Sequence, residues 1–526
     1  MRKLIILFLL GVSLNVSAQT TPFWTNTSYK GAFPVTDGTT STDWTNGWSN
    51  FDPENTNYPS TNSTISSDIT TNTTLSGTIL LQNKIYVTNG AILTILPGTI
   101  IRGDKTTQGT LIITKGCKII AEGTQNLPIV FTSNESVGNR TEGDWGGLVI
   151  LGQSTNNQPG GVANIEGIVP TANTQFGGTN DNDNSGILKY VRVEFGGIAL
   201  EPNKEINGIT FGSVGKGTQV DFVQVSFSGD DSYEWFGGTV DCKHLIAYRG
   251  IDDDFDTDFG YRGRIQFGLI IRDNTMYDAA GDSNGLESDN DATGSANTPQ
   301  TSVIFSNLTI IGAKGNGSLS LPTGEKFEKA FRIRRNSSIS VFNSLVVGWE
   351  KGLSIEGASC EANVTAGTLV FSNNVLTELP SSASYVTAAP TFFTTVASVN
   401  DTTTSVSQIN WVNAFPTLGT TPDCRLDSTS LVATGADFTN SKFVGGFVSV
   451  NEVSKTTNVS IYPNPATNNV NITTDRLVQV TLIDGMGRVI NTQSVSGTFS
   501  LDVSTLNNGI YFLQVDNTTK KIIVRK

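Results

Sequence analysis

Two nearby stretches of this sequence, VTNGAILTILPGT (residues 87–99) and ITKGCKIIAEGT (residues 113–124), share one pattern of short apolar runs separated by glycine. Gly90 corresponds to Gly116 at an offset of 26 residues. An offset of this size is typical of stacked structural repeats. Each unit therefore predicts two short β-strands joined by a glycine turn.

The same pattern continues along the chain. Further β-rich runs lie at Ile129–Thr132, Leu148–Leu151, Leu188–Phe195, Val220–Phe227, Leu245–Tyr248, Ile265–Ile271, Val303–Ile311, Ser340–Val347 and Leu369–Phe371. Short strands joined by polar turns could form a β-sandwich, a propeller or a parallel β-helix, and the repeat favours the last. The predicted fold class is all-β, with a right-handed parallel β-helix whose coils each bury apolar side chains against the next.

Composition supports strands over helices and sets limits on partners. The chain has 526 residues, more than one core normally serves unless the architecture is a repeat. Its formal charge is −13, and residues 19–450 alone carry −17. Nucleic acid and anionic membranes need basic surfaces, so they are poor partners, whereas cations and neutral polymers are better ones.

The N-terminus has the order of a secretory signal peptide. Arg2 and Lys3 precede an apolar run from Leu4 to Val12, and small residues lead to Ala18. The run is shorter than the roughly 20 residues of a membrane span. We expect residues 1–18 to be removed on export.

The rest of the chain divides into three expected parts. Residues 19–70 form an N-terminal cap region, residues 71–450 the β-helix body, and residues 451–526 a separate tail. Aromatic-rich stretches are the candidates for the caps that a solenoid needs at its ends. These stretches are Tyr29–Phe33, Trp44–Tyr58, Gly435–Phe438 and Phe443–Phe447, and the section 372–423 is expected to be irregular.

The few cysteines and the single histidine limit metal and redox chemistry. Cys117, Cys242, Cys360 and Cys424 form no CxxC pair, so a structural zinc site is not expected. Export permits disulfides, and Cys360 with Cys424 is the pair to test first; free buried thiols are the alternative. His244 is the only histidine and is more typical of a structural residue.

The tail changes in character at Tyr462, where the segment Tyr-Pro-Asn-Pro begins. Two prolines fix the backbone and remove two amide donors. At least five short β-rich runs follow within the tail, which predicts a small Ig-like β-sandwich.

The tail resembles the type A sorting domain of type IX secretion substrates, known from Bacteroidota. Four ordered motifs carry this resemblance: IYPNPA (461–466), LIDGMGRVI (482–490), LNNGIYFLQV (506–515) and KKIIVRK (520–526). The sorting-motif residues are Pro463, Asn464, Pro465, Gly485, Gly487, Gly509, Lys520 and Lys521. The resemblance implies delivery by the type IX machinery to the cell surface or medium, removal of the tail, and attachment of the body to surface lipopolysaccharide. An ordinary Ig-like binding module is the alternative.

Most of the negative charge of the body lies in one region. Residues 221–291 contain sixteen acidic and five basic side chains. On a strand, alternate positions would place Asp252, Asp254, Asp256 and Asp258 on one face, opposite Phe255. Repulsion among these carboxylates calls for a cation or for neighbouring arginines.

Calcium is the natural cation for such oxygen ligands. The candidate metal ligands are Asp252, Asp254, Asp256, Asp258, Glu287, Asp289 and Asp291. The spacing is not that of an EF-hand, because Ile265 stands where the bidentate acid belongs. Neutralisation by Arg249, Arg262 or Arg264, or a solvated acidic face, are the alternatives.

Carboxylates also suit glycoside hydrolysis, and a lyase would add a Lys or Arg base beside calcium. The candidate catalytic residues are Asp230, Asp231, Glu234, Asp253 and Asp254, and the candidate bases are Lys243, Arg249 and Arg262. His244 lacks the flanking glycines of the Gly-His-Gly element in polygalacturonase-type β-helices. Whether the body is an enzyme stays open.

Trp145 and Trp235, each followed by a Gly-Gly pair close by, are candidates for stacking on sugar rings, with core packing as the alternative. The body also resembles a group of surface β-helix proteins that carry this sorting tail and have no established activity. The matching motifs are LTILPGTII (93–101), GDWGGLVILG (143–152), DDSYEWFGGTVDCKHL (230–245), DDDFDTDFGY (252–261) and ESDNDATGS (287–295). Two hypotheses follow: a calcium-stabilised protein that binds glycans or other cells, or a carbohydrate-active enzyme.

Overall fold

The computed structural model describes residues 23–444, apart from 202–203, 280, 318, 326, 378–384, 387–398 and 416–419, and residues 460–526, apart from 485–487 and 516–517. The expected signal peptide, residues 1–18, lies outside the described residues. Contacts divide the chain into two compact units between Phe443 and Val444. Each unit is described by itself.

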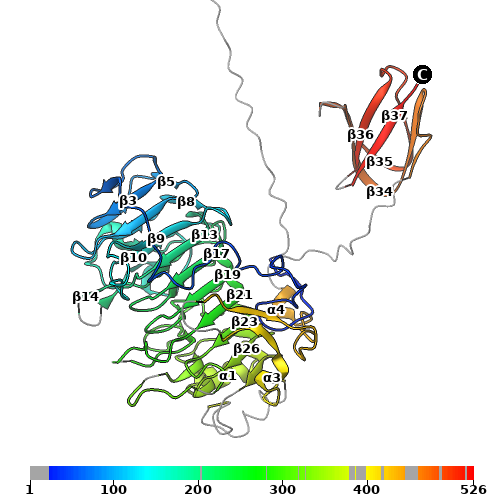
Figure 1. Ribbon diagram of the computed structural model, residues 1–526. Coiled ribbons are helices and arrows are strands. Elements are labelled where there is room, and N and C mark those ends of the chain that lie inside the picture. The colour runs from blue at the N-terminus through cyan, green and yellow to red at the C-terminus, as the bar shows by residue number, and fades with distance from the viewer. Residues whose placement is uncertain are drawn as a thin grey trace, which may run out of the picture. The chain divides into compact units, whose positions relative to one another are not determined.

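The first unit is a solenoid built from two long sheets in which every strand pairs in parallel with the next coil (Figure 1). The larger sheet contains β1 (Ser63–Ile65), β2 (Thr73–Leu75), β3 (Thr78–Leu81), β5 (Ile92–Ile95), β6 (Ile100–Gly103), β8 (Lys118–Glu122), β9 (Ile129–Ser133), β13 (Gly186–Glu194), β17 (Gln219–Ser226), β19 (Asp241–Tyr248), β21 (Arg264–Ile271), β23 (Ile304–Ile311), β25 (Ser340–Phe342), β26 (Leu345–Val347), β28 (Val370–Ser372) and β29 (Val375–Thr377). The second contains β4 (Lys84–Val87), β7 (Thr110–Ile113), β10 (Gly147–Leu151), β16 (Ile209–Gly212), β18 (Tyr233–Phe236), β20 (Phe255–Asp258), β22 (Leu286–Ser288), β24 (Lys329–Ile333), β27 (Lys351–Ile355) and β30 (Tyr385–Val386). The predicted parallel β-helix is confirmed.

The sequence repeat that predicted the fold reappears in the pairing register of the strands. In the pairing of β5 with β8, Ile92 lies opposite Lys118, which preserves the offset between Gly90 and Gly116. Both glycines have positive φ, 71° and 87°, a backbone conformation that glycine adopts at little cost. Cys117 is buried beside Lys118, whose backbone N–H donates to the Ala91 carbonyl of the preceding coil.

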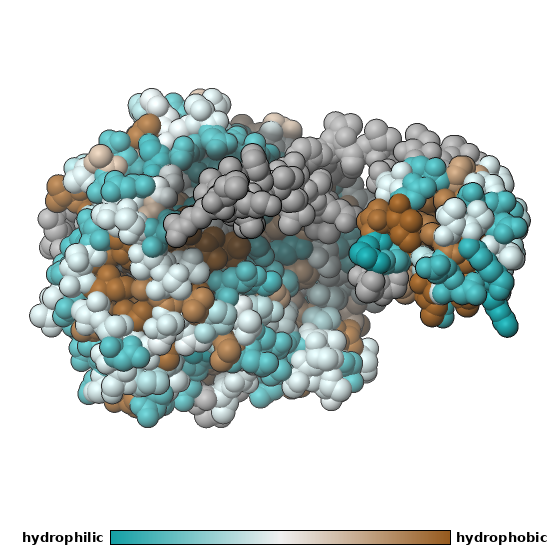
Figure 2. Space-filling view, turned by 90° about the horizontal axis from the view of Figure 1, so that it is seen from above, coloured by the Kyte–Doolittle hydropathy of each residue, from teal (hydrophilic) through white to brown (hydrophobic). Residues whose placement is uncertain are grey.

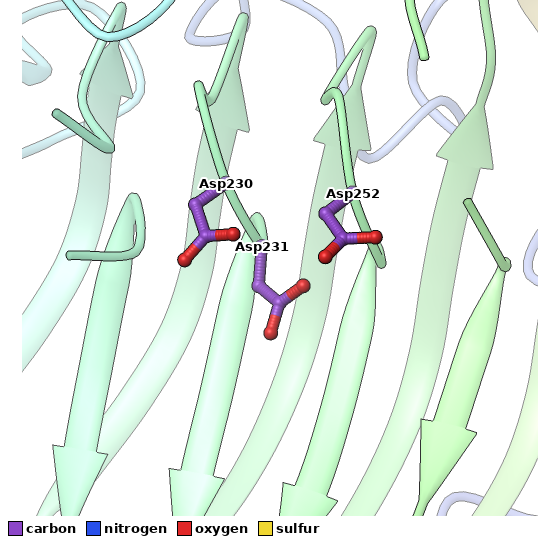
Figure 3. Close-up of side chains that lie close together, drawn as sticks. All are labelled: Asp230, Asp231 and Asp252. Atoms are coloured by element: carbon purple, nitrogen blue, oxygen red, sulfur yellow. The ribbon is translucent and has the colours of Figure 1, made fainter. Parts of the chain in front are cut away.

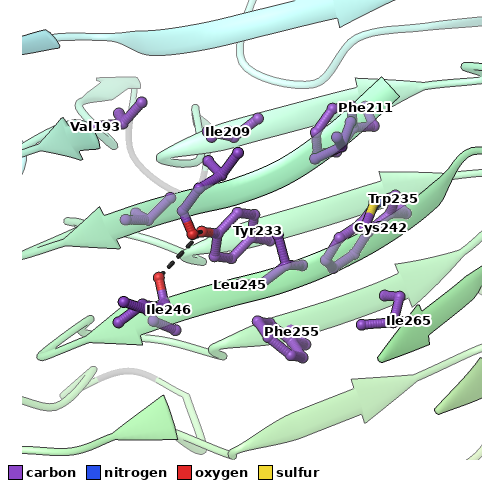
Figure 4. Close-up of a cluster of buried hydrophobic side chains, with 14 of the residues drawn as sticks. Val193, Ile209, Phe211, Tyr233, Trp235, Cys242, Leu245, Ile246, Phe255 and Ile265 are labelled. Carbon is purple, nitrogen blue, oxygen red and sulfur yellow. Dashed lines mark hydrogen bonds between the residues drawn. The ribbon is translucent and has the colours of Figure 1, made fainter. Parts of the chain in front are cut away.

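Apolar side chains from both sheets meet inside each coil (Figure 4). Tyr233, Trp235 and Phe255 project inward from β18 and β20 and are fully buried. The Tyr233 hydroxyl donates to the backbone carbonyl of Ile246 on the opposite sheet, at 3.0 Å. Alternation along β18 and β20 therefore sends the acidic side chains between these residues to the outside of the coil.

A ladder of residues with positive φ marks a corner in the larger sheet. Tyr190, Phe222, His244 and Phe267 occupy equivalent positions in four consecutive coils, with φ between 49° and 65°. Their rings stack at centroid distances of 4.6, 4.2 and 5.0 Å. His244 also pairs with Asp221 at 2.7 Å, which gives it the structural role expected of it.

The N-terminal segment, residues 23–58 and here called the strap, runs along this corner instead of covering an end of the solenoid. Trp48 contacts Tyr190 and Phe222 edge-on, and Trp44 packs beside His244. The predicted cap at Tyr29–Phe33 and Trp44–Tyr58 is therefore wrong in position. Its aromatic side chains pack against the flank of several coils, where they shield the stacked rings from water.

The C-terminal part of the body packs against the same flank. The Asn343 side chain donates to the Asp437 carbonyl, and Phe443 contacts Phe342; residues 445–447 of the second proposed cap lie outside the described residues. The smaller elements here and elsewhere in the body are η1 (Pro159–Gly161), η2 (Ala172–Thr174), α1 (Ala358–Thr365), α3 (Val406–Ile409), α4 (Ser441–Val444) and the hairpins β11 (Ala163–Asn164) with β12 (Gln175–Phe176), β14 (Ala199–Glu201) with β15 (Lys204–Glu205), and β31 (Trp411–Asn413) with β32 (Asp423–Leu426).

The four cysteines are buried free thiols. The disulfide proposed between Cys360 and Cys424 is therefore wrong, and the alternative of free buried thiols is confirmed. Each thiol fills a small space in an apolar environment, as a cysteine commonly does. Burial raises the pKa of the Cys360 thiol to about 11, which keeps it protonated at neutral pH.

The second unit is one antiparallel sheet of five strands: β33 (Ser460–Tyr462), β34 (Asn469–Ile483), β35 (Val489–Asp502), β36 (Gly509–Val515) and β37 (Thr518–Val524). Its own core contains Val470, Ile472 and Leu513. Apolar areas are visible on its surface in Figure 2, and Val489, Ile490 and Ile510 are exposed. The Ig-like sandwich stays a prediction.

The Pro463-Asn464-Pro465 segment has a clear structural role in this unit. The Asn464 side chain donates to the Lys521 carbonyl and accepts from the Ile523 N–H, both at 2.8 Å. It thereby pairs with the edge of β37 as a neighbouring strand would. Gly485 and Gly487 lie outside the described residues. No helix among the described residues is long and apolar enough to cross a membrane.

Candidate metal-binding site

The outward positions of the second sheet form a charged ladder. Thr210, Glu234, Asp256, Glu287 and Arg332 lie opposite one another in five consecutive coils. Neighbouring strands lie about 4.8 Å apart, so the three carboxylates approach closely. Residues Phe255 and Thr257 face inward while Asp256 and Asp258 face outward, which confirms the predicted alternation for these four residues.

The turns that enter β18 and β20 add three more carboxylates. Asp230 and Asp231 precede β18, and Asp252 precedes β20 in the next coil. Figure 3 shows the three side chains converging from these turns. One oxygen from each lies within 4.8 Å of the others, a spacing suited to a shared metal ion.

A second group of carboxylates shares Asp231 with the first. One oxygen each of Asp231, Glu234 and Asp256 also lies within 4.8 Å of the others. The Asn207 side chain donates to Glu234, which fixes that carboxylate. Asp256 Oδ1 is inaccessible to solvent and accepts no hydrogen bond.

Backbone hydrogen bonds hold the acidic turns in place from coil to coil. Asp231 Oδ1 accepts the Asp253 N–H at 2.8 Å, and Asp253 Oδ1 accepts the Asn284 N–H at 2.6 Å. Each carboxylate thus fixes the turn of the following coil. Asp231 and Asp253 are therefore partly structural, in addition to contributing charge.

Burial and mutual repulsion raise the pKa values of these carboxyl groups. Burial is the main cause at Asp231, Glu234 and Asp256, whose pKa values lie well above the usual range, and neighbouring carboxylates add to it. The pKa of Asp253 rises to about 8, through burial and then the charge of Asp252. A bound cation would remove both the repulsion and much of this protonation.

Arginines neutralise the acidic residues on the other side of the site. Arg272 pairs with Asp254 at 2.7 Å, and both side chains are fully buried. Arg334 pairs with Glu287 and, at 3.0 Å, with Asp289. Five of the seven candidate metal ligands, Asp254, Asp258, Glu287, Asp289 and Asp291, lie outside the two carboxylate groups found among the described residues.

Local structure explains the positions of three of these five residues. Asp254 lies before the strand begins, so it points into the coil toward Arg272 and not outward. Asp291 accepts hydrogen bonds from Thr293 and Ser295, which close a turn. Asp258 Oδ1 accepts the Phe259 N–H at 2.6 Å.

The arginines proposed from sequence as neutralising partners are engaged elsewhere. Arg249 pairs with Asp273, Arg262 with Asp181, and Arg264 with Asp241. The candidate base Lys243 donates to Thr25 of the strap. The three candidate bases Lys243, Arg249 and Arg262 thus bind other groups and not the acidic site.

The two tryptophans are part of the interior. Trp145 is fully buried and donates from Nε1 to the Glu194 carbonyl at 2.8 Å. Trp235 is fully buried and stacks between Phe211 and Tyr261. Neither ring can stack on a sugar, so the structure supports the core-packing alternative.

Sequence reasoning missed Asn207, Arg272, Arg332 and Arg334. A signal for the last two was available, because Phe331-Arg332-Ile333-Arg334 has the same alternation as Phe255-Asp256-Thr257-Asp258. No comparable pattern marks Asn207 or Arg272, whose positions depend on the register of the coils.

The two groups fit calcium better than a transition metal. All their ligand atoms are carboxylate oxygens, which calcium prefers, and neither group contains His or Cys. Asp256 Oδ1 offers a buried oxygen that has no donor. Asp230, Asp231, Glu234, Asp252 and Asp256 are thus the residues that would hold the ion.

Comparison with known families gives two matches. A pectate-lyase-like β-helix domain matches residues 63–416, and a secretion system C-terminal sorting domain matches residues 460–526. No curated protein matches the chain. The sorting domain supports export by the type IX system to the cell surface or beyond. The chain therefore belongs to the family of pectate-lyase-like β-helix domains and ends in a type IX secretion sorting domain.

Proposed function

We propose that the body is a calcium-stabilised β-helix that binds glycans or other cells at the bacterial surface. The proposal rests on the cluster of carboxylates formed by Asp231, Glu234 and Asp256. Among the described residues, the ion pairs of the acidic region include those to Asp254, Asp282, Glu287 and Asp289, and none goes to Asp231, Glu234 or Asp256. Carboxylates this close require a positive charge or protonation.

Stabilisation follows from the position of the site. Its ligands come from consecutive coils, so one ion would add a further connection between neighbouring coils. A ligand that binds the folded state alone raises stability in proportion to the logarithm of its concentration over Kd.

The export route supports a role outside the cell. After signal-peptide removal at residue 18 and loss of the tail, the body is expected to be attached to surface lipopolysaccharide or released. The strongly acidic body, −17 over residues 19–450, would stay soluble there and would not adsorb to anionic lipid.

A melting curve of the purified exported protein with calcium and with chelator tests the calcium site. We expect calcium to raise the melting temperature, and Asp231→Asn to abolish the increase because both groups lose a ligand. Asp291→Asn, outside both groups, should keep the increase. Melting that is indifferent to chelator in the wild type would contradict the proposal.

A carbohydrate-active enzyme is the second candidate. Raised pKa values of about 8 at Asp253 and Glu287 are typical of general acids, and the domain family is pectate-lyase-like. Oxygens within 4.8 Å of one another are closer than the carboxyl separation of inverting hydrolases, about 6.5 to 9.5 Å, which argues against an inverting mechanism. Incubation with uronate and neutral polysaccharides, followed by assays for reducing ends and for unsaturated products, decides between binding and cleavage.

A further inference from the structure

An open pocket lies between the strap and the β31–β32 hairpin, on a different part of the body from the acidic site. It encloses about 550 Å³, within the usual range for small-molecule sites. One wall comes from residues 36–40 and the other from residues 410–412 and 425–427. The two walls are joined by the Thr36 N–H, which donates to the Leu426 carbonyl at 2.8 Å.

The pocket combines one aromatic ring with polar groups. Trp411 is half-buried and lines it, in contrast to the buried Trp145 and Trp235. The polar lining residues are Thr36, Thr39, Thr40, Asn410, Arg425 and Asp427. An aromatic surface beside hydroxyl, amide and carboxylate groups suits the apolar face and the hydroxyls of a sugar ring.

The charges of the pocket favour an uncharged ligand. Arg425 and Asp427 are its only charged lining residues among those described, one of each sign. Arg425 is nearly fully buried and is neutralised by Asp423, with Nε and Nη2 at 2.9 and 2.7 Å from its two oxygens. It also donates to the Thr39 carbonyl, so it holds the walls together and leaves little charge for an anion.

The walls are held in a fixed shape before any ligand binds. Asp37 accepts hydrogen bonds from Thr39 and Ser41, which closes the turn that contains Thr40. Asn410 has a φ of 51° and its carbonyl accepts the Asp427 N–H at 2.8 Å. A preformed site spends less free energy on ordering when the ligand binds.

We propose that this pocket binds a neutral saccharide through Trp411. The inference rests on the proposed glycan-binding role and assigns it to a site that contains no calcium ligand. Binding here is independent of the acidic site, because none of the residues that line the pocket belongs to either carboxylate group.

Affinity measurements of the exported protein against a neutral β-glucan, a neutral α-glucan and a uronate polymer, each with calcium and with chelator, test the proposal. We expect binding to a neutral glucan that is equal in both conditions. Trp411→Ala should weaken it about tenfold, because the stacking surface of the ring is lost, and Trp411→Phe should restore part of it.

Because Trp411 also packs against the core of the body, a second variant leaves the core untouched. Thr40 is exposed, so Thr40→Arg should fill the pocket and abolish binding while the melting temperature stays unchanged. Leu431→Ala, an exposed apolar residue that does not line the pocket, is the matched control and should bind normally. Absence of neutral-glucan binding in the wild type, or normal binding by Thr40→Arg, would overturn the proposal. If calcium does not raise the melting temperature of the wild type, only the proposed calcium site is overturned.

Discussion

At the scale of single residues, the acidic region contains two different solutions to the same electrostatic problem. Asp254 is paired with a buried arginine, whereas Asp231 and Asp256 lie among other carboxylates. Breaking a buried ion pair leaves an uncompensated charge, and this costs more than the pair itself contributes. The two kinds of acid should therefore respond differently to substitution.

We predict that Arg272→Met lowers the free energy of unfolding by about 3–5 kcal/mol, because Asp254 is left charged and fully buried. The double variant Asp254→Asn/Arg272→Met should recover part of this loss. Arg264→Met breaks a partly exposed pair with Asp241 and should cost less than about 1 kcal/mol. Chemical denaturation measures all three. Equal losses for Arg272→Met and Arg264→Met would contradict the prediction.

The sequence could predict part of this site at the residue scale. Period 2 correctly placed Phe255 inside and Asp256 outside, because both lie on one strand. It failed for Asp254, since the strand begins only at Phe255. The partners Arg272 and Arg332 come from other coils, and only the register of the solenoid brings them near.

At the scale of secondary-structure elements, the raised pKa values of Asp253, in the turn before β20, and of Glu287, on β22, predict how stability depends on pH. Unfolded carboxyl groups titrate near pH 4, whereas Asp253 and Glu287 do so at about 8 when folded. Between these values the folded state binds more protons than the unfolded state. Stability therefore falls as pH rises from about 4 to 8 in chelator.

Calcium should reverse this trend, because its charge replaces the protons. We expect the melting temperature in chelator to be lower at pH 8 than at pH 5, and the difference to shrink or invert with calcium. Differential scanning calorimetry at several pH values measures both series. If the protein in chelator is more stable at pH 8 than at pH 5, the assigned pKa shifts are contradicted.

The strap provides a second prediction for elements. Trp48 is fully buried against the rings of Tyr190 and Phe222, so Trp48→Ala should cost about 3–5 kcal/mol. Coils of a solenoid can open separately, so proteolysis of the strap should also accelerate. Leu127→Ala, more than half exposed, should leave stability within about 0.5 kcal/mol.

Sequence could not place the strap because its aromatic residues lack a period. The repeats predicted the coils, since each coil repeats the one before it. Trp44 and Trp48 instead match the ladder of Tyr190, Phe222 and His244, whose positive φ values no propensity argument predicts. Only the pairing register of the coils shows that these residues form a ladder.

At the scale of the whole molecule, the chain joins a body and a tail with independent cores. The body core contains no residue of the tail, and the tail core is formed by tail residues alone, from Ala466 to Val524. Residues 451–526 carry seven basic and five acidic side chains, opposite in sign to the strongly acidic body. These differences support a tail that acts as a removable export signal.

Three variants separate export from folding. Deleting residues 444–526 should leave the melting transition of the body unchanged, because the contacts divide there, and should abolish export. Within the tail, Asn464→Ala removes both hydrogen bonds to the edge of β37 and should reduce export. The Asn508 side chain accepts a single hydrogen bond, from the Lys526 N–H, so Asn508→Ala should have a smaller effect. Cell fractionation and melting curves of the purified body measure both properties. A body destabilised by the deletion would mean that the tail is part of the working fold, because an independent export signal contributes no contacts to the β-helix core.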